Sequence, residues 1–162
     1  MAEITVHLLR HAHSSHAIPG ERDHHRGLDE RGHAEVEAIR LRLLRQPVGI
    51  VRIRCSTARR ARLTLESLLP VLGEVPLRYD DHLYAAGLEA YEAACVADGA
   101  ASPVLVVGHN PTIASFVARY ALQEGDAFRT GIKPATWITL RLGVDPGGRL
   151  GPGRLVTLIA PT

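Results

Sequence analysis

The segment 102–109, with the sequence SPVLVVGH, restricts the fold of this 162-residue chain more than any other feature. Its centre is an uninterrupted apolar run, rich in β-branched valine, without a polar position that could face solvent. Strands of this kind are buried on both faces, as in parallel sheets that helices cover on either side. The segment therefore predicts an α/β fold with three layers, an α/β/α sandwich.

The rest of the chain alternates between strand and helix patterns, as this architecture requires. Asp29 is the expected N-cap of the first helix, and Pro111 is the expected first residue of the last helix. Two further helical stripes lie between them, and Pro70 and Gly99 mark their ends. Before the valine-rich strand, further strands are expected at 3–9, 48–56 and 75–80.

The C-terminal part of the chain has a different pattern. Residues 136–142 and 153–160 have strand character and flank a turn-rich segment, which predicts an antiparallel hairpin. The length of the chain fits one domain over residues 1–162. We therefore expect a single domain with a mostly parallel sheet that ends in a C-terminal antiparallel hairpin.

The composition argues against several classes of protein. A net charge of +2, with no long basic run, does not favour binding to nucleic acid. No apolar stretch reaches the length of a membrane span, about 18 residues, and the N-terminus lacks the pattern of a signal peptide. The two cysteines, Cys55 and Cys95, do not have the spacing of a disulfide framework, so free thiols and a cytoplasmic location are expected.

Polar residues follow three of the expected parallel strands at their carboxyl ends. Ligands of such sheets bind at these ends, so the loops that follow should converge on one site. The first of these loops, 10–28, is long and lacks periodicity, which is typical of functional loops. The strand-end residues are Arg10 and His11, Cys55 and Ser56, and His109 and Asn110.

Histidines and arginines at these strand ends would suit phosphoryl chemistry. A guanidinium group binds a phosphoryl group through paired hydrogen bonds, and a neutral imidazole can attack phosphorus. Neighbouring positive charges disfavour the imidazolium and keep such a ring unprotonated near neutral pH. A helix N-terminus, expected after Asn110, would stabilise charge on the phosphoryl oxygens. The candidate arginines are Arg10, Arg59, Arg60 and Arg62.

The same region also contains an HxH pair, His11 and His13, which metallohydrolases use at strand ends. No cluster of Asp and Glu accompanies this pair, and the positive charge of Arg10 adjoins it. We therefore expect neither a metal nor another cofactor.

Several motifs, in order along the chain, resemble those of the histidine phosphatase superfamily, whose fold is phosphoglycerate mutase-like. Within this superfamily the motifs are most similar to those of the SixA-type phosphohistidine phosphatase branch. Arg10 and His11 match the RH pair that defines the superfamily. The matching segments are LLRHAHSS (8–15), RDHHRGLDERG (22–32), CSTARRARLTLE (55–66), VLVVGHNPTI (104–113) and TGIKPATWITLRL (130–142).

The resemblance implies a role for residues that match the motifs. His11 would be the nucleophile and would form a phosphohistidine intermediate. Arg10 and Arg60 would bind the phosphoryl group, and His109 would be the second histidine, in contact with the phosphoryl oxygens. Candidates for substrate binding around this centre are Arg26, His13 and Asn110.

The chain departs from the motifs at several positions. Ala85 stands where the mutase and larger phosphatase branches carry a glutamate general acid, which the SixA-type branch also lacks. A phosphoramidate leaving group has a basic nitrogen and needs less help from an acid than an alkoxide does. The missing glutamate therefore favours P–N bonds, or esters with good leaving groups. The other departures are Thr57 and Gly27 in place of proline, Leu63 in place of glutamine, and His13 in place of lysine or aspartate.

Together these observations predict a metal-independent phosphatase that removes phosphate from the phosphohistidine of a protein partner. Two alternatives stay open: a phosphatase for phosphoesters of small metabolites, and a non-catalytic module that binds phosphorylated ligands. His7, inside the first expected strand, is interpreted as structural. The proton donor is left open among His13, Asp81, His82 and water, as are the roles of His16, His24 and His25.

Overall fold

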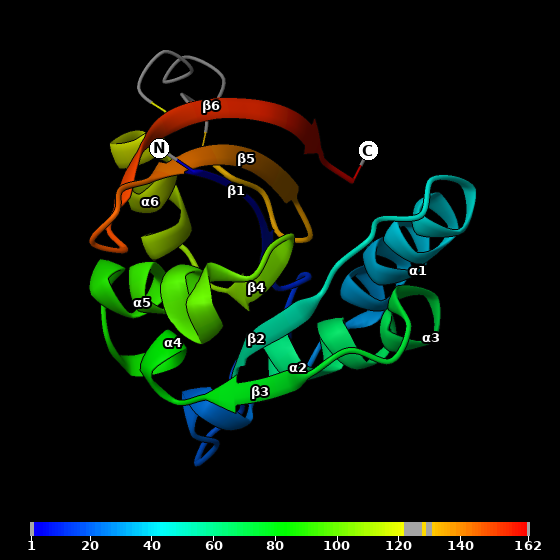
Figure 1. The fold of residues 1–162 in the computed structure, drawn as a ribbon. Helices are drawn as coiled ribbons and strands as arrows, with labels where there is room; N and C mark the ends of the chain where they lie inside the picture. The colour runs from blue at the N-terminus through cyan, green and yellow to red at the C-terminus, as the bar shows by residue number, and fades with distance from the viewer. Residues whose placement is uncertain (1, 122–127, 129–130, 162) are drawn as a thin grey trace.

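The computed structural model describes residues 2–121, 128 and 131–161. Over these residues the chain forms one sheet with the strand order β3-β2-β4-β1-β5-β6 (Figure 1). The two strands that precede His11 and His109, β1 and β4, are therefore neighbours near the centre of the sheet. The strands are β1 (Ala2–Arg10), β2 (Arg52–Ser56), β3 (Leu77–Asp80), β4 (Val104–Gly108), β5 (Trp137–Val144) and β6 (Leu150–Ile159).

The strand pairings confirm a mostly parallel sheet with a C-terminal antiparallel hairpin. Strand β4 is parallel to β1 and β2, and β2 is also parallel to β3. Strand β5 is antiparallel to β1 and to β6. Arg10 in β1 lies opposite Gly108 in β4. The next residues, His11 and His109, therefore leave the sheet side by side.

Helices cover both faces of the sheet, so the three-layer architecture is confirmed (Figure 1). In β4, Val104 and Val106 face the core beneath α5 and α6, whereas Leu105 and Val107 face the core beneath α1, α2 and α3. Because side chains alternate along a strand, burial on both faces explains why β4 has no polar position. The helices are α1 (Glu30–Arg45), α2 (Arg59–Glu66), α3 (Leu69–Leu72), α4 (His82–Ala85), α5 (Leu88–Ala100), α6 (Thr112–Tyr120) and the 3-10 helix η1 (Asp23–His25).

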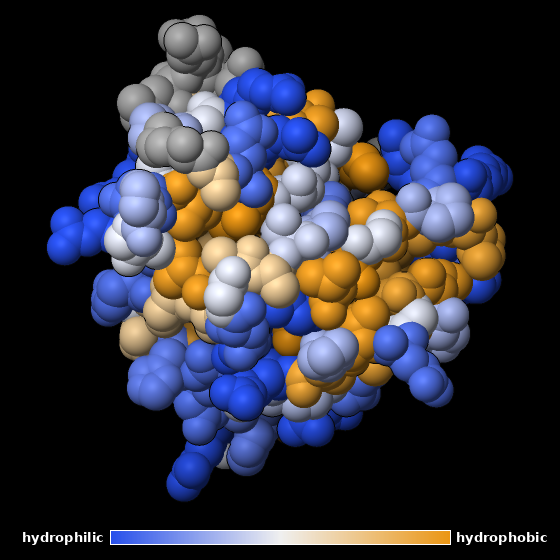
Figure 2. All heavy atoms as spheres, viewed as in Figure 1, coloured by the Kyte–Doolittle hydropathy of each residue, from blue (hydrophilic) through white to orange (hydrophobic). Residues whose placement is uncertain are grey.

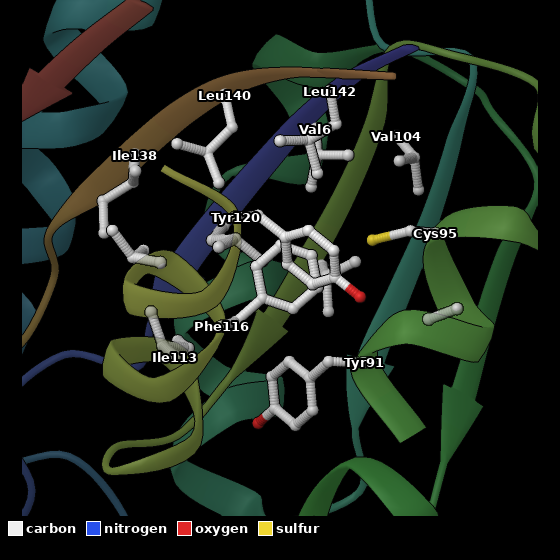
Figure 3. Packing of buried hydrophobic residues seen from close by; sticks show 14 of the residues in the cluster. Val6, Tyr91, Cys95, Val104, Ile113, Phe116, Tyr120, Ile138, Leu140 and Leu142 are labelled. Carbon is white, nitrogen blue, oxygen red and sulfur yellow. The ribbon is translucent and has the colours of Figure 1, made fainter. Parts of the chain in front are cut away.

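The core beneath α5 and α6 combines aliphatic side chains of the strands with aromatic rings of the helices (Figure 3). Phe116 and Tyr120 lie one turn apart on α6, with 4.8 Å between their ring centroids. Tyr91 on α5 is fully buried. Burial of a large side chain such as Phe116 stabilises the fold by roughly 2–3 kcal/mol. This packing fixes α6, which begins just after His109.

The structure corrects two boundaries in the middle of the chain. The second strand begins at Arg52 rather than at residue 48, because Ile50 donates its N–H to the Val48 carbonyl in a tight turn. Pro70 does not close the second helix, since α2 ends before it. Pro70 instead lies in the first turn of the short helix α3, where a backbone N–H is not needed.

Other boundaries shift by smaller amounts. Pro111 is the N-cap of α6 rather than its first residue. The hairpin strands β5 and β6 extend further into the turn-rich segment than the pattern predicted. Helix α4 was not predicted, because four residues are too few to show a helical period.

Helices long and apolar enough for a membrane crossing are absent from the part of the chain that the structure describes.

Candidate active site

The carboxyl ends of β1, β2 and β4 bring three functional side chains together. His11 follows β1, His109 follows β4, and Arg60 lies in the first turn of α2, just after β2. The ring centroids of the two histidines are 5.2 Å apart. Nε of Arg60 lies 3.3 Å from Nε2 of His11. All three residues are buried, so they form one enclosed cluster at the edge of the sheet.

His11 is held as a neutral imidazole with one defined tautomer. Its Nδ1 lies 2.7 Å from the carbonyl oxygen of Ala12. Because a carbonyl only accepts, Nδ1 carries the hydrogen and Nε2 has the lone pair. Burial, together with the charges of Arg60 and Arg10, lowers the pKa of His11 to about 4. The ring therefore presents an unprotonated Nε2 at neutral pH.

His109 is also neutral, and its backbone and ring are fixed separately. Burial and the neighbouring His11 lower its pKa to about 3. Its Nε2 lies 2.7 Å from Oγ of Ser56, and its backbone N–H donates to the hydroxyl of Tyr91 at 2.9 Å. The Tyr91 hydroxyl in turn donates to the Leu83 carbonyl. Within the described residues, Nδ1 of His109 is buried without a hydrogen-bond partner.

Gly108 is required for this arrangement because the Tyr91 ring lies against it. A Cβ atom at this position would overlap the Tyr91 hydroxyl, far inside van der Waals contact. Figure 3 shows the Tyr91 ring in the core between the helices and the sheet. The glycine of the GHNP motif therefore makes room for the tyrosine that holds the His109 backbone.

We expect Gly108→Ala to destabilise the protein by about 1–3 kcal/mol, because the added methyl group overpacks a filled core. The urea unfolding midpoint measures this effect. Gly49→Ala is the matched control, since a Cβ there would meet nothing within 4 Å. Equal unfolding midpoints for the two variants would contradict the packing argument.

The segment just before β5 holds the backbone around Arg10 and His11. The Ala135 N–H lies 3.1 Å from the carbonyl oxygens of both residues, and the Arg10 N–H donates to Thr136. Nη1 of Arg10 donates to the Ile132 carbonyl at 2.6 Å. The strand that carries the nucleophile candidate is thus clamped by residues from the C-terminal part of the chain.

Asp23, which was not among the predicted site residues, pairs with the arginines Arg26 and Arg60. Its carboxylate accepts hydrogen bonds from Arg60, Arg26 and Tyr84, at 3.1, 2.9 and 2.9 Å. Its carbonyl accepts a further bond from Arg60 at 2.9 Å. Partial burial alone would raise the pKa of Asp23, but the bonds from Tyr84 and Arg60 outweigh this and lower it. The three-residue spacing of Asp23 and Arg26 was the available signal.

The 3-10 helix η1 and helix α4 border the cluster through Asp23 and Tyr84, and we call this side of the site its mouth. Hydrophilic side chains gather over the end of the molecule at which η1 lies (Figure 2). The Tyr84 ring from α4 lies 5.7 Å from the His109 ring and 4.8 Å from the His24 ring, measured between centroids. Tyr84 was also missed, because it belongs to the short helix that has no periodic signal.

The three substrate-binding candidates lie in different places. Arg26 reaches the cluster through its ion pair with Asp23. Asn110 donates from Nδ2 to the Ile132 carbonyl, which also accepts from Arg10. His13 is turned onto the start of α1, where its Nδ1 lies 2.6 Å from Oδ2 of Asp29. Their roles in substrate binding stay predictions.

Asp29 is the N-cap of α1, as predicted, and it links the helix to the loop after His11. Its Oδ1 accepts from the Gly32 N–H at 2.9 Å. Glu35, further along α1, accepts a hydrogen bond from the backbone N–H of His13 at 2.8 Å. A side chain at Gly32 would overlap the His13 carbonyl. Residues 30–32 (ERG) therefore position the loop after His11 and do not contact the cluster.

His7 is buried in the sheet, as expected for a structural residue. Its Nδ1 accepts from Nε1 of Trp137 at 3.0 Å and lies 2.8 Å from Oγ1 of Thr139. Burial lowers the pKa of His7 to about 4. Its position inside β1 and its partners on β5 tie these two strands together.

The buried histidines His7, His11 and His109 should make stability depend on pH. Their pKa values of about 4, 4 and 3 lie below the ordinary 6.5. At pH values between 6.5 and the lowered pKa values, the histidines of the unfolded chain bind protons that those of the folded chain do not. The free energy of unfolding therefore falls as pH decreases. From pH 7 to pH 5 we expect a loss of about 2 kcal/mol per histidine, measured by urea unfolding.

His7→Gln tests this expectation, because it removes one titrating group but keeps a hydrogen-bond acceptor. From pH 7 to pH 5, the free energy of unfolding of this variant should fall less than that of wild type, by on the order of 2 kcal/mol. His16→Gln, at an exposed position, should keep the full dependence. An unchanged slope in His7→Gln would show that His7 does not contribute.

Comparison with known proteins supplies the family. Residues 6–94, more than half of the chain, match the model of the histidine phosphatase superfamily (branch 1). The comparison with curated proteins found no match.

Solved structures agree over nearly the whole chain. A candidate phosphohistidine phosphatase SixA from Agrobacterium tumefaciens is 32% identical, with a TM-score of 0.81 over 98% of each chain. A second SixA candidate, from Nakamurella multipartitia, is 28% identical, with a TM-score of 0.79 over 100% of this chain and 98% of the other. The protein histidine phosphatase SixA in complex with tungstate shares the fold, with a TM-score of 0.78 at 22% identity over 98% and 97%.

These matches support a phosphatase, a hydrolase. The chain belongs to the histidine phosphatase superfamily and, within it, to the SixA-type branch.

Proposed function

We propose that this protein is a metal-independent phosphatase that removes phosphate from the phosphohistidine of a protein partner through an intermediate on His11. The observation that carries the proposal is the neutral Nε2 of His11, which lies within hydrogen-bonding distance of the Arg60 guanidinium. An unprotonated imidazole beside a fixed cation suits attack on a phosphoryl group. The cytoplasmic location expected from the sequence stays a prediction.

In the first step, Nε2 of His11 attacks phosphorus, and the bond from phosphorus to the leaving nitrogen breaks. Nε–H of Arg60, now directed at Nε2, would turn to a phosphoryl oxygen. Arg10 would contribute a second positive charge. The buried Nδ1 of His109, unpartnered within the described residues, suits contact with another oxygen. In the second step water attacks phosphorus, the P–Nε2 bond breaks, and inorganic phosphate leaves.

The lack of a glutamate at position 85 supports phosphohistidine as the substrate. Ala85, where other branches carry the glutamate, lies at the end of α4. A basic leaving nitrogen needs less acid assistance than an alkoxide. The SixA candidate from Agrobacterium tumefaciens, at 32% identity, supports the same substrate class.

The test compares a phosphohistidine-bearing protein with a panel of sugar and nucleotide phosphates, each with and without EDTA. We expect the highest kcat/KM for the phosphohistidine protein and no effect of the chelator. A clear preference for one small phosphoester would instead identify a metabolite phosphatase. Binding without turnover would identify a non-catalytic module, and loss of activity with EDTA would contradict metal independence.

A further inference from the structure

His24, Thr57 and Asp81 form a chain of hydrogen bonds across the mouth of the site. Nε2 of His24 lies 2.9 Å from Oγ1 of Thr57, and the Thr57 hydroxyl donates to Oδ1 of Asp81. Because that hydroxyl hydrogen is used, Oγ1 accepts from His24, and Nε2 carries a hydrogen. The motif has proline in place of Thr57, and proline could make neither bond.

The Tyr84 ring links His24 to the cluster, since its centroid lies 4.8 Å from that of the His24 ring and 5.7 Å from that of the His109 ring. The preceding residue, Asp23, accepts from Arg60 through its carbonyl, and the His24 ring packs edge-on against Tyr84 at 85°. His11 is buried, with 7% of its surface exposed, whereas η1 and α4 form the mouth. In-line displacement at phosphorus sends the leaving group away from Nε2 of His11. A departing group would reach solvent at this mouth, where His24 and Tyr84 are partly exposed.

We propose that His24 transfers a proton to the leaving group, and that Thr57 and Asp81 are positioning residues; this rests on the proposed function. In the reacting form, the His24 ring is an imidazolium with a hydrogen on each ring nitrogen. As Nε2 of His11 bonds to phosphorus and the leaving-group bond breaks, the proton on Nδ1 moves to the departing atom and leaves a neutral ring with its hydrogen on Nε2. In the second step, water bonds to phosphorus, the P–Nε2 bond breaks, and a proton from water returns to Nδ1. Within the described residues, no hydrogen bond engages Nδ1.

The other proton-transfer candidates are occupied or remote. His13 pairs with Asp29 at the start of α1. The His82 side chain is 80% exposed and lies against Asp80. Burial and the Asp23 carboxylate raise the pKa of Tyr84, so its hydroxyl is a weaker acid than an ordinary phenol. Asp81, also considered from the sequence, contacts Thr57 and would act through His24.

The test uses aryl phosphates whose leaving groups differ in basicity, from 2,4-dinitrophenyl phosphate to phenyl phosphate. His24→Gln keeps an N–H for Thr57 but cannot transfer a proton. We expect kcat/KM to fall about 10²-fold for phenyl phosphate and less than about threefold for the dinitrophenyl ester. Thr57→Val, which keeps the shape of the side chain, should give the same pattern with a smaller loss.

His25→Gln is the matched control, since His25 is an exposed neighbour on the same 3-10 helix. It should leave the leaving-group dependence unchanged. Equal losses on both esters in His24→Gln, or no loss, would overturn the inference. If wild type hydrolyses neither the esters nor a phosphohistidine protein, or if His11→Ala stays active, the proposed function fails. If His11→Ala is inactive and the leaving-group dependence of His24→Gln is that of wild type, only the role of His24 fails.

Discussion

Replacing His11 with alanine is expected to abolish turnover, with kcat reduced by at least about 10³-fold. The substitution removes the Nε2 lone pair that would bond to phosphorus, and no other neutral imidazole nitrogen in the cluster is similarly placed. His109 cannot substitute, because its Nε2 is paired with Ser56 and its Nδ1 is the nitrogen proposed to contact a phosphoryl oxygen. Steady-state kinetics on an aryl phosphate and on a phosphohistidine protein measure the effect.

His16→Ala is the matched control for this prediction. It makes the same substitution in the same loop, at an exposed position, and should keep wild-type kcat. Rapid acid-free quenching with mass spectrometry should also detect a phosphoryl group on wild-type His11 that is stable in alkali and absent from His11→Ala. Wild-type activity in His11→Ala would reject the intermediate, whatever the substrate.

Arg60→Lys should reduce kcat/KM by about 10²–10³-fold, although the charge is kept. The guanidinium has three contacts from one rigid plane: Nε with His11, and its two terminal nitrogens with Asp23. A lysine ammonium carries its donors on one atom and cannot span these partners. The loss should therefore reflect geometry rather than net charge.

The neighbouring Arg59 provides the control. Arg59→Lys changes an exposed side chain whose only hydrogen bond within the described residues, to the His25 carbonyl, is 3.5 Å long. It should change kcat/KM by less than about twofold. Similar losses in the two variants would show that positive charge at the start of α2 is sufficient.

The sequence was informative where one physical constraint dominates. Burial on both faces left no polar position in β4, so the layers could be predicted from Val104 to Val107. The convergence of His11 and His109 followed from parallel strands ending at one edge. The position of Arg60 could be predicted because a helix that starts after a strand end presents its first turn to that edge of the sheet.

Contacts between short, irregular segments could not be predicted from the sequence. Asp23 and Tyr84 meet through a three-residue helix and a four-residue helix, neither long enough to show a period. The bond between His24 and Thr57 depends on how the loop folds back over α2, and no local pattern encodes that path. Tyr91 lies in the core, and only its hydroxyl contacts reveal its link to His109.

The clamp of residues 132–136 on Arg10 and His11 has a consequence for biosynthesis. A growing chain that has emerged only through α6 already contains both histidines and Arg60, but not the carbonyls and N–H groups that fix the end of β1. Contacts between residues more than 120 positions apart form late, because the long loop must close first. Activity should therefore be acquired near the end of synthesis, so that ribosome-bound fragments stay inert toward phosphorylated partners.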